Sequence, residues 1–186
     1  MNKDIKKWLE KDGIKFLKDI GIKEGQTVLD FGCGEGHYAI PIAKVVGEQG
    51  KVYAVDKDEK VLGRLMERAK SKGLKNIEAK QSSSELKIGL KDGSMDVVLF
   101  YDVLHYIDNK RKIFEEIARI LKSGALFSLY PKHHKLDRHP LMEMSLEDII
   151  KEVKSANFSF ERRLYKGLIH DEKCEKDYIL NFRKKV

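Results

Sequence analysis

The chain has 186 residues, of which 41% are hydrophobic and 36% are charged, so it is long enough for one globular domain with a heavily charged surface. No apolar run reaches the roughly 18 residues of a membrane helix, and the charged N-terminus has no apolar signal-peptide core. We therefore expect a single domain over residues 1–186, located in the cytoplasm.

The net charge of +7 and the two cysteines limit the classes of partner and metal site that the chain could have. A positive charge suits nucleic-acid binding, but the basic residues are spread among acidic ones, with no long basic tract interleaved with aromatics. An ordinary lysine-rich surface is therefore favoured, and nucleic-acid binding is the alternative. Cys33 and Cys174 form no CxxC pair, so we expect reduced thiols and no cysteine zinc site.

The chain alternates between apolar runs and helical patterns. Residues 2–20 have the apolar spacing of an amphipathic helix, or of two short helices broken near Gly13. The strands that follow are predicted at 27–31, 51–56, 77–80, 95–101 and 125–130. The helices are predicted at 38–46, 58–72, 111–121 and 146–156.

The last two strands are predicted at 158–165 and 177–183, joined by a polar segment. They read as an antiparallel hairpin at one edge of the sheet. The earlier strands are fully apolar and alternate with helices, which favours a mostly parallel sheet covered on both faces. The sequence therefore predicts an α/β three-layer sandwich with a seven-stranded, mostly parallel sheet and a C-terminal antiparallel hairpin.

A glycine-rich turn follows the first predicted strand. Asp30 precedes three glycines at alternate positions, Gly32, Gly34 and Gly36, and a helical pattern begins after them. Glycine lets the backbone approach a ligand closely, and a helix N-terminus offers free N–H groups. The turn lacks the lysine of a phosphate-binding loop and the GxGxxG spacing of dinucleotide folds, since His37 stands where the last glycine belongs.

The segments VLDFGCGEGHYAIPIAK and VYAVDKD resemble motif I and the next acidic motif of class I S-adenosylmethionine-dependent methyltransferases. NIEAKQSSSEL, SMDVVLFYDVLHYI and IFEEIARILKSGALFSL continue the resemblance, with Lys122-Ser123-Gly124 where the family has Lys-Pro-Gly. The likeness covers roughly residues 25–130 and is greatest to the small-molecule branch that includes quinone-biosynthesis methyltransferases. It implies a Rossmann-like fold that uses S-adenosyl-L-methionine and releases S-adenosyl-L-homocysteine.

The resemblance also implies where the methyl donor binds. Asp30 would lie near the donor's ammonium group, and the turn would face its methionine portion. Asp56, at the end of the second strand, would accept hydrogen bonds from both ribose hydroxyls. The implied donor contacts are Asp30, Gly32, Cys33, Gly34, Gly36, Asp56, Lys57, Ser83, Ser84 and Tyr101. Lys57 would lie along the adenine, and Ser83 stands where the family often has an acid.

The methyl acceptor is expected near the end of the fourth strand. Tyr101 follows that strand directly, and His105 has an ordinary pKa suited to a general base, so both are candidate catalytic residues. The alternative for His105 is a structural histidine on a short helix after the strand. The segment FYDV has no proline, which disfavours an enzyme that methylates the amines of nucleic-acid bases, and no proline-cysteine nucleophile is present.

The segment after the fifth strand is rich in basic residues. Tyr130, His133, His134 and His139 are candidates for contact with the acceptor. With Asp137 the histidines could instead bind a metal, or the segment could be an ordinary surface loop, and no metal is predicted. Residues 1–20 are the candidate lid, although they could simply pack on the sheet.

These observations predict an S-adenosylmethionine-dependent enzyme that methylates a small molecule at O, N, S or C. One alternative is an RNA methyltransferase, which the charge of +7 would suit. The other is a non-catalytic module that binds S-adenosylmethionine.

Overall fold

The computed structural model describes residues 2–82, 87–132, 144–170 and 172–186. The seven strands follow the order β3-β2-β1-β4-β5-β7-β6. The chain forms two compact units, and each is described by itself below. Unit 1 holds Met1–Gln81 with Tyr165–Asp177, and unit 2 holds Ser82–Leu164 with Tyr178–Val186. The single domain predicted over the whole chain stays a prediction.

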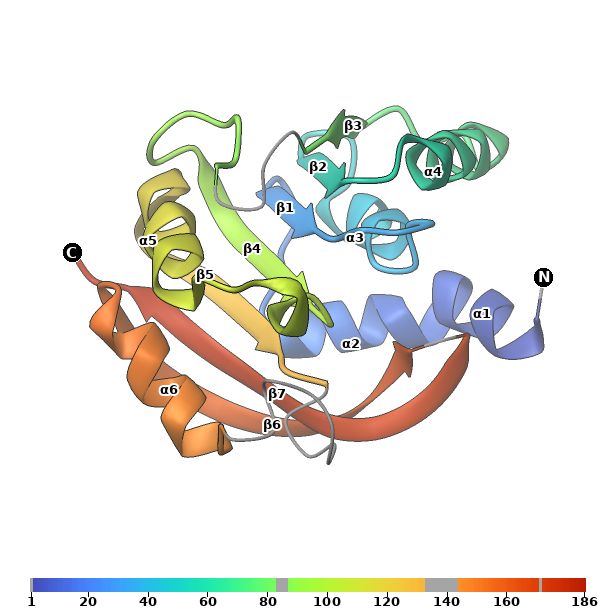
Figure 1. Ribbon diagram of the computed structural model, residues 1–186. Coiled ribbons are helices and arrows are strands. Elements are labelled where there is room, and N and C mark those ends of the chain that lie inside the picture. The colour runs from blue at the N-terminus through green and yellow to red at the C-terminus, as the bar shows by residue number, and fades with distance from the viewer. Residues whose placement is uncertain (1, 83–86, 133–143, 171) are drawn as a thin grey trace. The chain divides into compact units, whose positions relative to one another are not determined.

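Unit 1 is built on three parallel strands. β1 (Thr27–Phe31) pairs with β2 (Lys51–Asp56), and β2 pairs with β3 (Ile77–Gln81). Helix α3 (Ala39–Val46) packs on all three strands, and α4 (Glu59–Ser71) packs on β2 and β3 (Figure 1). Because the strands are parallel, β1 and β2 both end at the edge of the sheet where the glycine turn begins.

The N-terminal segment is helical throughout. It consists of α1 (Lys3–Lys7), the π-helical turn η1 (Trp8–Asp12) and α2 (Gly13–Ile20). A break near Gly13 is therefore not found, since the φ of Gly13 is −65°. A Cβ on Gly13 would lie 2.9 Å from the Trp8 ring, so this glycine provides room for the buried indole. The Trp8 Nε1 group donates to the His37 carbonyl at 2.8 Å, which ties the segment to the start of α3.

The C-terminal strands are longer than the sequence predicted. β6 covers Phe158–His170 and β7 covers Lys173–Lys184, so the polar segment between the predicted strands is mostly strand. The backbone hydrogen bonds of an antiparallel ribbon form whether its side chains are polar or apolar. The polarity of this segment was therefore a poor guide to where the strands end. The sequence signal for a longer strand was the apolar pair Leu168 and Ile169, which is buried. The Tyr38 hydroxyl donates to the Ile169 carbonyl at 2.9 Å.

Unit 2 contains the other parallel pair. β4 (Met95–Tyr101) pairs with β5 (Leu121–Tyr130), and β5 pairs antiparallel with β7. The 3-10 turn η2 (Leu104–Tyr106) follows β4, and helices α5 (Lys110–Ile120) and α6 (Leu146–Ser155) pack on each other. Ser145 and Asp148 form a capping box at the start of α6, because they exchange both hydrogen bonds.

β5 begins four residues before its predicted start. α5 ends at Ile120 and the strand starts at Leu121, with no connecting loop. The segment Lys122-Ser123-Gly124, which suggested a turn, lies within β5, and Gly124 has φ +73°. The pairing shifts register there, because Met95 faces Leu121 whereas Val97 faces Leu126. A bulge thus absorbs the residues that sequence patterns assign to a turn.

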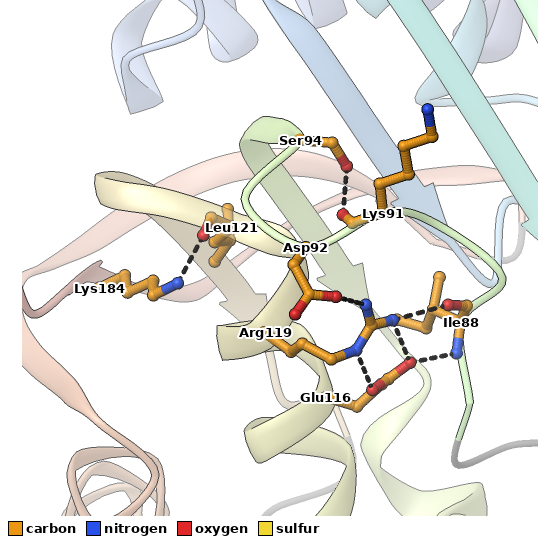
Figure 2. Close-up of polar contacts among 8 residues, drawn as sticks. All are labelled: Ile88, Lys91, Asp92, Ser94, Glu116, Arg119, Leu121 and Lys184. Atoms are coloured by element: carbon orange, nitrogen blue, oxygen red, sulfur yellow. Dashed lines mark hydrogen bonds and ion pairs between the residues drawn. The ribbon is translucent and has the colours of Figure 1, made fainter.

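An ion-pair cluster fastens the segment before β4 to helix α5, as Figure 2 shows. Arg119 donates from Nε to Glu116 at 2.8 Å, pairs with Asp92, and donates from Nη2 to the Ile88 carbonyl at 3.0 Å. Glu116 in turn accepts the Ile88 N–H at 2.7 Å. The cluster fixes a segment without regular secondary structure by satisfying its backbone groups.

In the part of the chain that the structure describes, no helix has the length and apolar character needed to cross a bilayer.

Candidate functional site

The glycine turn in unit 1 is held by the strand next to it. The N–H groups of Gly32 and Cys33 both donate to the Val55 carbonyl of β2, at 2.8 and 3.1 Å. Gly32, Gly34 and Gly36 have φ values of +75°, +49° and +83°, a region that side chains strongly disfavour. The alternate glycines of the sequence are therefore required by the shape of the turn.

Asp30 places a buried carboxyl beside this turn. Its residue is 2% exposed, and Oδ2 has no hydrogen-bond partner among the described residues. Burial raises the pKa of Asp30 to about 7, a hydrogen bond from the Ala39 N–H opposes the rise, and the nearby charge of Asp56 adds to it. A buried, unpaired carboxylate oxygen is costly unless a ligand supplies a donor. Asp30 is thus suited to pair with a cationic group.

Asp56 joins the turn to the end of β2. Its Oδ2 accepts the Gly34 N–H at 2.9 Å, and its Oδ1 accepts the Asp58 N–H at 3.0 Å. Each carboxylate oxygen keeps a second lone pair, so Asp56 can still accept from a pair of hydroxyls. Lys57 follows directly, and its carbonyl accepts a hydrogen bond from the Gln81 side chain at 3.1 Å.

The last two glycines of the turn have different surroundings. A Cβ on Gly34 would meet no described atom within 4 Å, so the space above this glycine is open. A Cβ on Gly36 would lie 2.8 Å from the Leu65 Cγ of α4. Gly34 therefore leaves room for something outside the protein, whereas Gly36 lets the turn pack directly on α4.

Cys33 fills the turn and has no sign of reactivity. The residue is buried, and burial together with the charges of Asp30 and Asp56 raises the pKa of its thiol. A thiol of raised pKa is a poor nucleophile, because the thiolate is the reactive form. Its backbone N–H donates to Val55, and its thiol donates a weak hydrogen bond to the Gly34 carbonyl at 3.7 Å, so both help to hold the turn.

In unit 2, His105 lies on η2 next to Asp102. The His105 side chain is 5% exposed, and its Nδ1 is 3.6 Å from the Asp102 carboxylate. Asp102 has φ +57°, an uncommon conformation for a residue other than glycine, and its position directly after β4 aims it back at the histidine. The His105 and Tyr106 rings also contact each other, with centroids 3.8 Å apart. The 3.6 Å between Nδ1 and the carboxylate is longer than a hydrogen bond, so Asp102 lies beside Nδ1 without being hydrogen-bonded to it.

Tyr101 ends a chain of buried hydroxyl and amide groups. Its hydroxyl lies 2.7 Å from the Ser128 Oγ, and Ser128 donates to the Asn181 Oδ1 at 2.9 Å. Because the single Ser128 proton goes to Asn181, Ser128 accepts from Tyr101, and the tyrosine is the donor of that bond. A phenol engaged in this way is poorly suited to act as a base, and the catalytic role of Tyr101 stays a prediction.

We expect Ser128→Ala to destabilise unit 2 by about 1–3 kcal/mol, because Tyr101 and Asn181 each lose one buried hydrogen bond. Urea unfolding measures the change. Ser94→Ala is the control, since the Ser94 hydroxyl bonds the Lys91 carbonyl at the surface and its removal should cost less than about 0.5 kcal/mol. If both variants lost the same free energy of unfolding, the buried hydrogen bonds of Ser128 would contribute no more to stability than the surface bond of Ser94.

The remaining predicted site residues are only partly placed. Tyr130 ends β5 in unit 2, and its ring meets that of Tyr101 edge to face, with centroids 6.1 Å apart. Ser83, Ser84, His133, His134 and His139 lie outside the described residues. Within residues 2–82, 87–132, 144–170 and 172–186, no group of three histidine, cysteine or acidic side chains is placed to hold a metal ion.

One open depression of about 870 Å³ lies elsewhere in unit 1. Its lining includes Lys51 and Ile77, the first residues of β2 and β3, so it lies at the amino ends of these strands. Ligands of open α/β sheets bind at the opposite, carboxyl ends. The glycine turn, and not this depression, is therefore the candidate site.

A family model described as a methyltransferase domain matches residues 22–182. The chain belongs to this family. Demethylmenaquinone methyltransferases of Geobacillus stearothermophilus and Lactobacillus johnsonii are 27% and 32% identical over 117 and 109 residues, covering 61% and 58% of the chain. These matches cover 50% and 44% of the two relatives, so the chain spans about half the length of the curated relatives that it matches.

Solved methyltransferase-domain structures agree with this assignment. A SAM-dependent methyltransferase from Aquifex aeolicus is 30% identical, with a TM-score of 0.75, and the match covers 97% of this chain and 96% of that one. The predicted Rossmann-like α/β fold, mostly parallel with antiparallel C-terminal strands, is confirmed. The prediction of a class I methyltransferase that resembles quinone-biosynthesis methyltransferases, with S-adenosylmethionine as donor, is confirmed at the level of the family.

Several polar residues of this methyltransferase domain were missed by sequence analysis. Ser128 and Asn181 each interrupt an apolar strand, a signal that was available and was not used. Asp102 is paired with His105 at a spacing of three residues, but its backbone conformation has no signal in a single sequence.

Proposed function

We propose that this chain transfers a methyl group from S-adenosylmethionine to a small-molecule acceptor. The observation that carries the proposal is the Asp30 carboxyl, which is buried beside the glycine turn with an oxygen that no described group satisfies. An ammonium group fits this position because it supplies both charge and hydrogen bonds. S-adenosylmethionine has such a group, and the family of the chain uses this donor.

The other residues at the turn fit the remaining parts of the donor. The open space at Gly34 would admit the methionine portion against bare backbone, and Asp56 would accept the ribose hydroxyls through its remaining lone pairs. Lys57 follows Asp56 and would lie along the adenine. The donor, when bound, supplies a methyl group activated by a sulfonium sulfur, so the protein chiefly has to align the acceptor and remove its proton.

His105 is the candidate for removing that proton. Its Nδ1 lies 3.6 Å from the Asp102 carboxylate, so a small movement of either side chain would let the aspartate hold the imidazole with Nε2 as the base. Tyr101 would position the acceptor rather than remove its proton, because its hydroxyl proton is already donated to Ser128. Sterol and menaquinone methyltransferases among the relatives suggest an apolar, ring-containing acceptor.

Calorimetry with S-adenosylhomocysteine tests the donor site. We expect Asp56→Asn to weaken binding by about tenfold to a hundredfold, because two hydroxyls lose a charged acceptor and the Gly34 N–H loses its carboxylate. Asp58→Asn is the control, since Asn keeps the helix cap at Lys60 and should bind within about twofold. Equal binding by Asp56→Asn and the unaltered chain would contradict the proposal.

Turnover is tested by incubating the protein with S-adenosylmethionine and a panel of quinols, sterols and RNA, and by following S-adenosylhomocysteine release. Methylation of RNA, with binding that falls steeply with salt, would replace the small-molecule proposal by the RNA alternative. A cytoplasmic location stays a prediction.

A further inference from the structure

The residue between the last two glycines of the turn is fastened to α4 by two arginines. Glu35 Oε1 accepts from the Arg64 Nε at 2.6 Å, and Oε2 accepts from the Arg68 Nη2 at 3.0 Å. Arg68 also donates from Nη1 to the Glu35 backbone carbonyl at 3.1 Å. Burial alone would raise the pKa of the Glu35 carboxyl, but the two arginines outweigh it and hold this pKa below its ordinary value.

This Glu35–Arg64–Arg68 clamp closes a ring of contacts around the donor site. The Gly34 N–H donates to Asp56, and Asp56 accepts the Asp58 N–H. Asp58 caps α4, and α4 carries the two arginines back to the turn. The clamp therefore fixes the position of the turn relative to Asp56. The turn and Asp56 are proposed to hold opposite ends of the donor.

The clamp acts where the backbone is otherwise weakly constrained. Three glycines with positive φ have many alternative conformations, so ordering the turn costs entropy. The side chains of Glu35, Arg64 and Arg68 are 32%, 50% and 23% exposed, and ion pairs this exposed add little to global stability. Their effect is local, because a turn already held in its binding shape does not have to be ordered by the ligand.

We propose that Glu35, Arg64 and Arg68 are positioning residues that preorganise the glycine turn for the methyl donor. The inference rests on the proposed function, since it assumes that the turn binds S-adenosylmethionine. None of the three side chains has to touch the donor, because the carboxylate and both guanidinium groups are directed at one another.

The test compares Glu35→Gln with Glu78→Gln by calorimetry with S-adenosylhomocysteine. Glu78 is a matched control, since it also pairs with two cations, Lys51 at 2.6 Å and Lys80 at 3.2 Å, away from the turn. We expect Glu35→Gln to bind about fivefold more weakly, with a less favourable binding entropy, and Glu78→Gln to bind within about twofold. Arg68→Lys keeps the charge, loses the forked contact, and should fall between the two.

Hydrogen exchange separates positioning from a general loss of stability. In Glu35→Gln the amides of Gly34 and Gly36 should exchange faster, while the unfolding temperature stays within about 2 °C of the unaltered protein. The inference is overturned if Glu35→Gln binds within twofold while Asp56→Asn has lost affinity. If Asp56→Asn also binds normally, the proposed function fails and the clamp inference falls with it.

Discussion

Replacing Asp30 by Asn is expected to weaken donor binding by about tenfold to a hundredfold, because the ammonium group loses a buried charged partner. The unaltered protein should also bind more tightly as pH rises from 5.5 to 7.5. Burial raises the pKa of Asp30 to about 7, so below that pH the carboxyl is protonated and pairs poorly with a cation. The affinity of Asp30→Asn should not change over this range, and calorimetry measures both proteins.

The same substitution is expected to make the free protein more stable at pH 8. The folded pKa of about 7 lies above the ordinary value of 3.8, so the folded state keeps a proton that the unfolded chain has lost between these values. Stability therefore falls as pH rises from about 4 to 7, by up to roughly 4 kcal/mol in total. Asn bears no such charge, but its unpaired amide costs about 1–3 kcal/mol.

We thus expect Asp30→Asn to gain about 1–3 kcal/mol at pH 8 and nothing at pH 5, as measured by urea unfolding at each pH. Asp96→Asn is the control, since Asp96 is paired with Lys122 at 2.6 Å and its replacement should bring no gain. A loss of stability at pH 8 in Asp30→Asn would show that the carboxyl is already satisfied in the free protein.

The two glycines of the turn should separate binding from folding. Gly34→Ala should lower donor affinity by about tenfold to a hundredfold and cost only about 1–2 kcal/mol of stability, because its methyl group points into open space and strains only the backbone. Gly36→Ala should cost about 2–5 kcal/mol, because its methyl group would also lie 2.8 Å from Leu65. Thermal unfolding and calorimetry are measured on both.

Gly73→Ala provides the reference for the backbone cost alone. Gly73 has φ +69°, and a Cβ there would meet no described atom within 4 Å. It follows α4 at the end remote from the turn, so its replacement should leave donor affinity unchanged. If Gly34→Ala bound the donor as well as Gly73→Ala does, the open space at Gly34 would not be part of the site.

Local patterns located most elements and the glycine turn of the candidate site. The boundaries of β1, β2 and β4 were predicted to the residue, because apolar runs flanked by glycine or charge leave few alternatives. The turn glycines were found since their backbone conformation demands that residue type. Such features are encoded over a few neighbouring residues.

Features that depend on distant pairing were not predictable in this way. The ends of β6 and β7 depend on backbone hydrogen bonds between strands, which polar side chains do not reveal. Glu35 meets Arg64 and Arg68, which lie about thirty residues further along the chain, so a single sequence gives no means of pairing them. The hydrogen bond of Tyr101 was not predictable for the same reason, since its partner Ser128 lies on another strand.

At the junction between α5 and β5, the fold depends on the number of residues as well as on their identity. Ile120 ends the helix and Leu121 begins the strand, so no loop residue separates them and only the bulge after Leu121 could take up an insertion or deletion. One residue added at the junction itself would turn the helix by about 100° or move the strand to its opposite face. Related sequences should therefore vary in composition at this point but keep a constant number of residues.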